Sequence, residues 1–333
     1  MWHKSCTSTA RLDGKIAVIT GANTGIGKET AREFYRRGAR VLLACRNVEK
    51  AKMALEDIKN NPFSSNGRQN KQFAEKLGEL EIYPLDLCSL KSIRECAKSI
   101  LSKEPAIHLL INNAGVMMPP YEITKDGFEL QFQSNYLGHF LLTMLLLPKI
   151  QLSAPGCRIV NVSSLAHYFG NIHFNDLNMK DFFKLTRPLR AYGQSKLANI
   201  LFTKELARRL KEANIDGINV YSLHPGVVRT ELGRSFNKTI IPGATLFFRY
   251  VMLPFIKNPM QGAQTTIYCA ISENTANETG LYYTECKAVT PFSKAMNFTV
   301  AKKLWDHSCR LLDLEPDENL TTFLTTVSHQ LNE

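Results

Sequence analysis

A short apolar run that ends in a glycine-rich turn is the feature that most constrains the fold of this chain. Residues 15–20 (K-I-A-V-I-T) are rich in branched side chains, which is typical of a strand buried on both faces of a parallel sheet. The turn T-G-A-N-T-G-I-G follows, and residues 25–37 then have a helical pattern. A strand, a glycine turn and a helix in this order predict the first unit of an open α/β sheet.

Apolar runs and helical patterns continue to alternate along the chain. We expect further strands at residues 39–45, 81–87, 109–112, 158–163 and 219–223, and a second helix at 48–59. The very apolar stretch 137–147 is too short for a membrane span, which takes about 20 residues, and we expect a buried helix that ends at Pro148. These patterns predict an α/β fold with a single doubly wound parallel sheet of the Rossmann type and helices on both faces.

The net charge of +11 and the eight cysteines limit the classes of partner and compartment. The charge is concentrated in residues 28–59 and 180–212, but no nucleic-acid-binding motif accompanies it, so we expect no nucleic-acid partner. The cysteines form no C-x-x-C pair and the histidines no H-E-x-x-H group. We therefore expect reduced thiols, no metal, and histidines that are core or surface residues.

Residues 1–11 contain no apolar run, so we expect an intracellular protein with neither a signal peptide nor an N-terminal transmembrane helix.

The glycine turn and the end of the second strand together indicate a dinucleotide site. Glycines let the backbone approach a pyrophosphate closely, and a helix start presents free N–H groups and the positive end of its dipole to the phosphates. A protein that prefers NAD places Asp or Glu after the second strand to bind the ribose 2′-hydroxyl, whereas this chain has Cys45-Arg46-Asn47. Because the Arg46 guanidinium suits a 2′-phosphate, the predicted cofactor is NADP(H).

Tyr192 and Lys196 have the spacing Y-x-x-x-K, which places both side chains on one face of a helix. A neighbouring ammonium and a cationic nicotinamide favour the phenolate, so we expect the pKa of Tyr192 to lie below its usual value of about 10. Ser164 follows the end of a predicted strand and is expected to hydrogen-bond a substrate oxygen, with Ser163 as the alternative. The chain has no G-x-S-x-G motif, which disfavours serine hydrolase chemistry.

These motifs resemble those of the short-chain dehydrogenase/reductase superfamily, in which the spacing G-x-x-x-G-x-G is usual. The resemblance implies interconversion of an alcohol and a carbonyl, with Ser164 and Tyr192 at the reacting oxygen, Lys196 at the ribose, and Asn135 supporting a water relay to Lys196. It also implies a cofactor site that comprises Gly21, Asn23, Thr24, Gly25, Ile26, Gly27, Arg46, Asp86, Leu87, Asn113, Ala114, Gly115, Tyr192, Lys196, Pro225, Gly226, Val228 and Thr230.

Ser164 and Tyr192 are 28 positions apart, whereas the family usually separates this pair by about a dozen residues. The intervening insertion contains His167, Tyr168 and His173, together with the pair Phe182-Phe183, and we expect it to border the pocket.

The phrases A-C-R, N-Y-L-G-H-F-L-L-T and S-S-L-A-H resemble retinol dehydrogenases, with similarity over residues 12–315. This resemblance implies a small lipophilic substrate, either retinol/retinal or a related lipid aldehyde. One alternative is a steroid or xenobiotic carbonyl reductase. The other, a non-enzymatic NADPH-binding protein, is disfavoured by the intact set Asn135, Ser164, Tyr192 and Lys196.

We divide the chain into an N-terminal arm (1–14), one catalytic domain (15–315) and a C-terminal tail (316–333). Within the domain, residues 60–79 are polar and predict a surface insertion. Residues 235–260 are apolar, but proline, glycine and arginine interrupt them, which disfavours a spanning helix. This segment is a packed loop-helix, a lid over a lipophilic substrate, or a peripheral contact with an intracellular membrane in an otherwise cytoplasmic protein. The sequence carries no prediction of an oligomeric state.

Overall fold

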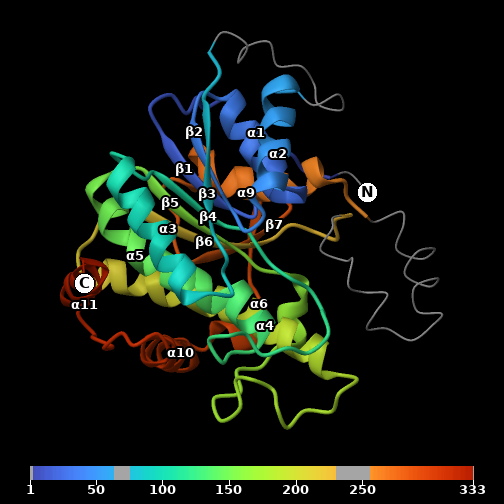
Figure 1. The fold of residues 1–333 in the computed structure, drawn as a ribbon, viewed down its shortest axis with the longest axis vertical. Coiled ribbons are helices and arrows are strands. Elements are labelled where there is room, and N and C mark those ends of the chain that lie inside the picture. The colour runs from blue at the N-terminus through green and yellow to red at the C-terminus, as the bar shows by residue number, and fades with distance from the viewer. Residues whose placement is uncertain (1–2, 64–75, 230–255, 333) are drawn as a thin grey trace.

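The computed structural model describes residues 3–63, 76–229 and 256–332. Within them, one sheet has the strand order β3-β2-β1-β4-β5-β6-β7-β8 (Figure 1). Its strands are β1 (Ile16–Thr20), β2 (Arg40–Cys45), β3 (Glu79–Pro84), β4 (Leu109–Asn112), β5 (Cys157–Val162), β6 (Ile218–His224), β7 (Leu281–Thr284) and β8 (Lys287–Val289). All neighbouring strands are parallel except β7 and β8, which form an antiparallel hairpin. The predicted doubly wound α/β fold is confirmed, with its chain reversal between β1 and β4.

Helices connect the strands and cover both faces of the sheet. The α-helices are α1 (Gly25–Arg36), α2 (Val48–Asn60), α3 (Leu90–Lys103), α4 (Leu130–Phe132), α5 (Gly138–Leu152), α6 (Arg187–Glu212), α9 (Pro259–Ile271), α10 (Phe298–Leu311) and α11 (Leu320–Asn332). A π-helix, η2 (Gln133–Leu137), joins α4 to α5. Short 3₁₀ segments are η3 (Leu165–Phe169), η6 (Glu273–Thr275) and η7 (Ser293–Met296). None of the described helices is long and apolar enough to cross a bilayer.

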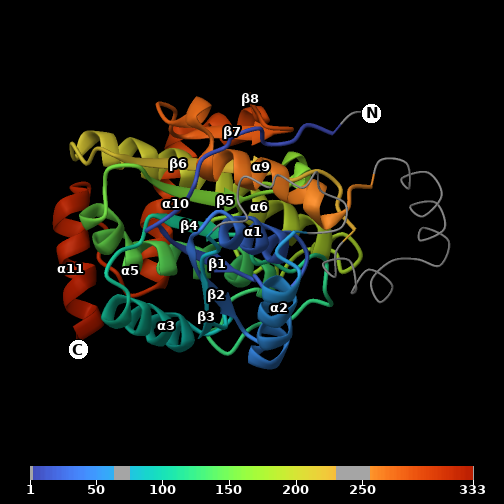
Figure 2. The ribbon, with the colours of Figure 1, turned by 90° about the horizontal axis from the view of Figure 1, so that it is seen from above.

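Two hydrophobic cores lie on opposite faces of the sheet because successive strand side chains point in opposite directions. In β1, Ile16 and Val18 join the core beneath α3, α5, α6, α10 and α11. Ala17 and Ile19 of the same strand join the second core, beneath α1, α2 and α9. Figure 2 shows the two helical layers with the sheet between them. Burial on both faces explains why the sequence of β1 is apolar without alternation.

Two expectations about element ends are corrected. Helix α5 runs through Pro148 to Leu152, although Pro148 was expected to end it. Proline removes one helical hydrogen bond, but residues 138–147 and Ile150 of α5 are buried, and this tertiary packing outweighs the local cost. Strand β3 ends at Pro84 rather than at residue 87, so Asp86 and Leu87 leave the sheet.

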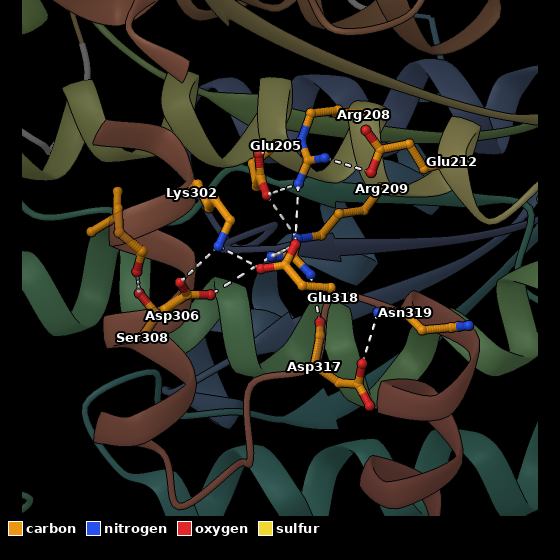
Figure 3. Close-up of polar contacts among 11 residues, drawn as sticks. Glu205, Arg208, Arg209, Glu212, Lys302, Asp306, Ser308, Asp317, Glu318 and Asn319 are labelled. Atoms are coloured by element: carbon orange, nitrogen blue, oxygen red, sulfur yellow. Dashed lines mark hydrogen bonds and ion pairs between the residues drawn. The ribbon is translucent and has the colours of Figure 1, made fainter. Parts of the chain in front are cut away.

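The C-terminal segment packs on the same core as the sheet. Within the expected tail, 316–333, helix α11 buries Phe323 and Val327 against that core. An ion-pair network, with Glu205 and Arg209 buried at its centre and the other members more exposed, attaches α10 and the turn before α11 to α6 (Figure 3). In it, Arg209 donates to Glu205 at 2.8 Å and to the Asp317 carbonyl at 2.6 Å. The guanidinium of Arg209 also stacks over Trp305, 4.5 Å from the ring centroid. Residues 320–327 are therefore part of the packed structure.

The N-terminal arm lies against the domain as well. Leu12 is buried, its N–H donates to the Arg37 carbonyl at 2.8 Å, and the Cys6 N–H donates to the Gln264 side chain at 3.0 Å. Most of the predicted insertion, 64–75, and most of the apolar segment, 230–255, lie outside the described residues. The division into arm, domain and tail stays a prediction.

Candidate active site

A cleft of about 670 Å³ opens at the carboxyl ends of the parallel strands. Its lining comes from the segments that follow β1, β2, β3, β4, β5 and β6, together with one face of α6. In open α/β sheets this edge, at the point of chain reversal, is where ligands bind. Every predicted site residue lines the cleft except Asn135, which lies behind it, and Thr230, which lies outside the described residues.

The glycine turn fits a pyrophosphate. Gly21 has a φ of +66°, which favours glycine, and a Cβ on Gly27 would come within 2.5 Å of the Asn113 amide and the Gly21 carbonyl. Thr24, the N-cap of α1, makes no side-chain capping bond, and the first turn of α1 contains no acidic residue. The N-terminus of α1 therefore presents uncapped N–H groups and a positive dipole end to the cleft, as a bound phosphate requires.

Thr20, at the end of β1, connects the glycine turn to the segment after β4. Its hydroxyl oxygen accepts hydrogen bonds from the N–H groups of Asn113 and Ala114, both at 2.9 Å. The Asn113 side chain returns a bond to the Thr20 carbonyl at 2.8 Å. These bonds hold the chain from Asn113 to Gly115 beside the glycine turn, along one wall of the cleft.

Arg46 follows β2 at the rim of the cleft. Its side chain is exposed and forms no hydrogen bond or ion pair with the part of the chain that the structure describes. The next residue, Asn47, is occupied as the N-cap of α2 and accepts from the Lys50 N–H at 2.8 Å. The two residues directly after β2, Arg46 and Asn47, carry no carboxylate, so the chemistry of this corner fits an anion such as a 2′-phosphate.

Tyr192 and Lys196 lie on one face of α6, and both are buried and line the cleft. The Lys196 ammonium donates to the Val162 carbonyl at 2.9 Å and lies 5.8 Å from the centroid of the Tyr192 ring. The expected decrease of the Tyr192 pKa is wrong for this structure. Burial raises that pKa to about 12, against a smaller lowering effect of the hydrogen bond with Ser164. Burial also lowers the pKa of Lys196 to about 8. Desolvation by burial is the largest cause of both pKa shifts.

The two serines after β5 have different surroundings. The Ser163 hydroxyl is buried and donates to the Lys196 carbonyl at 2.6 Å. Ser164 caps η3, and its hydroxyl oxygen accepts from the Ala166 N–H at 3.2 Å. The hydroxyl hydrogen of Ser164 is therefore available for another acceptor. Ser164 and Tyr192 both line the cleft, and the Ser164 hydroxyl lowers the pKa of Tyr192, so Ser164 lies at the reacting end.

Asn135 is fully buried within the π-helix η2. Its side chain accepts from the Val116 N–H at 2.8 Å and donates to the Val116 carbonyl and to the Ser195 hydroxyl, both at 3.0 Å. Its backbone carbonyl contacts His139 Nδ1 at 3.0 Å. Asn135 thus braces the segment after β4 against the helix that carries Tyr192 and Lys196. A π-bulge is often found at a functional site.

Sequence reasoning missed several residues of the cleft. His224, assigned with the other histidines to core or surface, lines it directly before Pro225. The place of His224 in the sequence, directly before the Pro225-Gly226 pair, could have indicated that it lines the cleft. Apolar side chains also line the cleft, namely Val116, Met117, Pro119, Leu165 and Val227. No group of three or more His, Cys, Asp or Glu side chains in the described ranges is arranged to hold a metal ion.

Comparisons of the sequence and the structure with known proteins identify the family of this chain. The family model described as short chain dehydrogenase matches residues 15–176. Human retinol dehydrogenase 11 is 48% identical over 94% of this chain and 90% of its own length. Human retinol dehydrogenase 13 is 46% identical over 93% of this chain and 88% of its own. A crystal structure of an uncharacterized protein from Mycobacterium paratuberculosis has a TM-score of 0.71 at 32% identity, covering 94% of this chain and 99% of that one.

The matches extend over nearly the whole chain, so the protein is an oxidoreductase of alcohol and carbonyl groups whose fold binds a nicotinamide cofactor. This chain belongs to the short-chain dehydrogenase family of oxidoreductases and is similar to the retinol dehydrogenases within it.

Proposed function

We propose that this protein is an NADP(H)-dependent oxidoreductase that interconverts retinol and retinal or a closely related lipophilic alcohol and aldehyde. The observation that carries the proposal is that Ser164, Tyr192 and Lys196 share one cleft with the glycine turn and Arg46. Relatives named as retinol dehydrogenases support the substrate class. Apolar lining such as Met117, Pro119 and Leu165 beside the polar residues suits a lipophilic molecule with one reactive oxygen.

The cleft residues would hold the cofactor along the carboxyl edge of the sheet. The turn from Gly21 to Gly27, with Asn23, Thr24, Gly25 and Ile26, would bind the pyrophosphate through backbone N–H groups, and Arg46 would bind the 2′-phosphate. Asp86 and Leu87 would serve the adenine side, and Asn113, Ala114 and Gly115 the middle of the dinucleotide. Pro225, Gly226, Val228 and Thr230 would hold the nicotinamide end. When bound, the cofactor supplies or accepts the hydride.

The chain's own residues handle the proton. In the reductive direction Ser164 donates a hydrogen bond to the carbonyl oxygen, and Tyr192 donates the proton that turns this oxygen into a hydroxyl. With a pKa near 12, Tyr192 is protonated at neutral pH, which is the form that reduction requires. Lys196 orients the ribose, and Asn135 supports the relay that returns a proton to the tyrosine.

The substrate class is tested with a panel of carbonyl compounds at saturating NADPH, followed by loss of NADPH absorbance. The panel contains all-trans-retinal, a linear lipid aldehyde, a keto-steroid and a small hydrophilic aldehyde. We expect the highest kcat/KM for retinal or the lipid aldehyde. A preference for the keto-steroid would instead indicate a steroid or xenobiotic carbonyl reductase. Binding of NADPH without turnover of any compound would indicate a non-enzymatic protein.

We also propose that the protein acts inside the cell and contacts an intracellular membrane peripherally. All eight cysteines are free. The side chains of Phe169, Phe183 and Leu185 are 67%, 72% and 58% exposed. In the sequence, basic residues of the 180–212 stretch stand between Phe183 and Leu185 and after Leu185. Exposed apolar side chains beside cations suit an anionic lipid surface. Sedimentation with phosphatidylcholine vesicles should increase when phosphatidylserine is added and decrease with salt; no sedimentation under any condition would contradict the proposal.

A further inference from the structure

Two histidines hold one peptide group at the reacting end of the cleft. The carbonyl oxygen of Ser164 is 2.7 Å from His167 Nδ1. The N–H of Leu165 donates to His224 Nδ1 at 3.2 Å. The Ser164 carbonyl and the Leu165 N–H belong to the same planar peptide group, so the two imidazoles restrain it from both of its hydrogen-bonding sides. The sequence insertion supplies His167, and the end of β6 supplies His224.

The hydrogen bonds define the tautomer of each ring. His167 Nε2 accepts from the Phe292 N–H at 3.3 Å, so its proton is on Nδ1, which donates to the Ser164 carbonyl. His224 Nδ1 accepts from Leu165, so its proton is on Nε2. Burial lowers the pKa of His167 and lowers that of His224 to about 4, which keeps both rings neutral. Lys257 and His167 also disfavour a charge on His224, against a weaker opposite effect of Glu285.

The surroundings keep these rings in place. His167 is fully buried, and its ring packs 4.5 Å from the Tyr168 ring and 5.2 Å from the Tyr282 ring, between centroids. His224 is anchored in the sheet, where it pairs with Thr284 of β7. The His167 ring is therefore not free to follow the peptide if it rotates, and the His224 backbone is fixed by the strand.

The restrained peptide determines where the Ser164 side chain points. Ser164 has an extended backbone, with φ −156° and ψ 159°, and its hydroxyl oxygen already accepts the Ala166 N–H. The orientation of the 164–165 peptide sets ψ of Ser164, and ψ determines where the first turn of η3, with the Ala166 N–H, lies relative to the Ser164 side chain. Holding the peptide therefore keeps the Ala166 N–H on the Ser164 hydroxyl oxygen, which leaves the hydroxyl hydrogen directed at the position of the substrate oxygen.

We propose that His167 and His224 are positioning residues that fix the Ser164–Leu165 peptide and so aim the Ser164 hydroxyl at the reacting oxygen. The inference rests on the proposed function, because it assigns the two histidines a role in the same reaction. It gives the long insertion between Ser164 and Tyr192 a specific part in catalysis. His224 is the more accessible test, because it contacts the peptide only through an acceptor nitrogen.

The test compares three variants of His224 in the full-length enzyme. His224→Phe keeps the ring shape but removes the acceptor. His224→Asn places an amide oxygen near the position of Nδ1, whereas His224→Gln places it beyond that position. For His224→Phe and His224→Gln we expect kcat to fall about tenfold, the size expected when one neutral hydrogen bond is lost. His224→Asn should keep most of the activity. The NADPH Kd should stay unchanged in all three.

A double-mutant cycle with Ser164→Ala separates positioning from general damage. In the Ser164→Ala background, His224→Phe should have no further effect on kcat, because there is no hydroxyl left to aim. His307→Phe, a histidine on α10 outside the cleft, is the matched control and should leave kcat unchanged. If His224→Phe does not fold, the comparison of His224→Asn with His224→Gln decides the question alone.

Two results would overturn the inference while leaving the proposed function intact. One is wild-type kcat in His224→Phe or in His224→Gln. The other is an equal fold-decrease from His224→Phe in the wild-type background and in the Ser164→Ala background. Absence of turnover in the wild-type protein on every carbonyl compound would overturn the proposed function and this inference together.

Discussion

The Ser163 hydroxyl donates to the Lys196 backbone carbonyl at 2.6 Å, although the serine directly follows β5 and the lysine lies within α6. This bond ties the helix that carries the reacting tyrosine to the segment after β5 that carries the substrate serine. It also commits the Ser163 hydrogen, so that only Ser164 retains a hydroxyl hydrogen for substrate.

The two serines therefore respond differently to substitution. Ser164→Ala should reduce kcat by about 100-fold, because a hydrogen bond made to the developing charge on oxygen is lost. Ser163→Ala removes a buried hydrogen bond to a carbonyl that the helix itself still pairs, so it should lower the free energy of unfolding by only about 0.5–1.5 kcal/mol, with a much smaller effect on kcat. Steady-state kinetics and urea denaturation measure the two effects. The reverse pattern would make Ser163 the substrate-binding serine.

Cofactor preference depends on Arg46. Arg46→Asp replaces a guanidinium with a carboxylate that repels a 2′-phosphate and accepts from a 2′-hydroxyl, so kcat/KM for NADPH should fall by about 100-fold and that for NADH should rise. Lys52→Asp on α2 is the charge-matched control, since Lys52 is exposed, pairs with Glu49, and is not among the residues that line the cleft. If kcat/KM for NADPH and kcat/KM for NADH are each the same before and after the Arg46 change, Arg46 does not contact the phosphate.

The two directions of the reaction should depend differently on pH. Burial raises the pKa of Tyr192 to about 12, so below that pH the phenolate that oxidation requires increases about tenfold per pH unit. We expect kcat/KM for alcohol oxidation to rise between about pH 6 and about pH 9, until the pKa of Tyr192 in the cofactor complex is reached. Carbonyl reduction needs the protonated phenol and should not rise over this range. A fall in oxidation with increasing pH would contradict this role of Tyr192.

The network in Figure 3 should control stability and not chemistry. Glu205 is 1% exposed and accepts from both Arg208 and Arg209, so Glu205→Ala leaves the buried Arg209 without its closest carboxylate. We expect a loss of about 3 kcal/mol in the free energy of unfolding, measured by urea denaturation, with unchanged kcat in the folded protein. Glu95→Ala, which breaks an exposed pair with Lys91, should change stability by less than about 1 kcal/mol. Equal effects of the two changes would contradict the network's role.

Local patterns were sufficient to predict the β1–turn–α1 unit and the Tyr192–Lys196 spacing, because both depend on residues close together in sequence. The β7–β8 hairpin was not predicted. Its strands are short, and β7 is recognisable mainly by its pairing with β6. Likewise, His224 reaches Leu165 only because β5 and β6 are neighbours and their ends meet. The predicted direction of the Tyr192 pKa shift was wrong because the sequence indicates a nearby charge but not how deeply the phenol is buried.

The measurement that tests the central claim most directly is the kcat of Tyr192→Phe for retinal reduction, made alongside its Kd for NADPH. Removing one hydroxyl from a buried ring removes the proton donor and leaves the cofactor site in place. We predict a decrease in kcat of at least about 100-fold with an unchanged NADPH Kd. A kcat equal to that of the wild-type enzyme would contradict the assignment of Tyr192 as the proton donor.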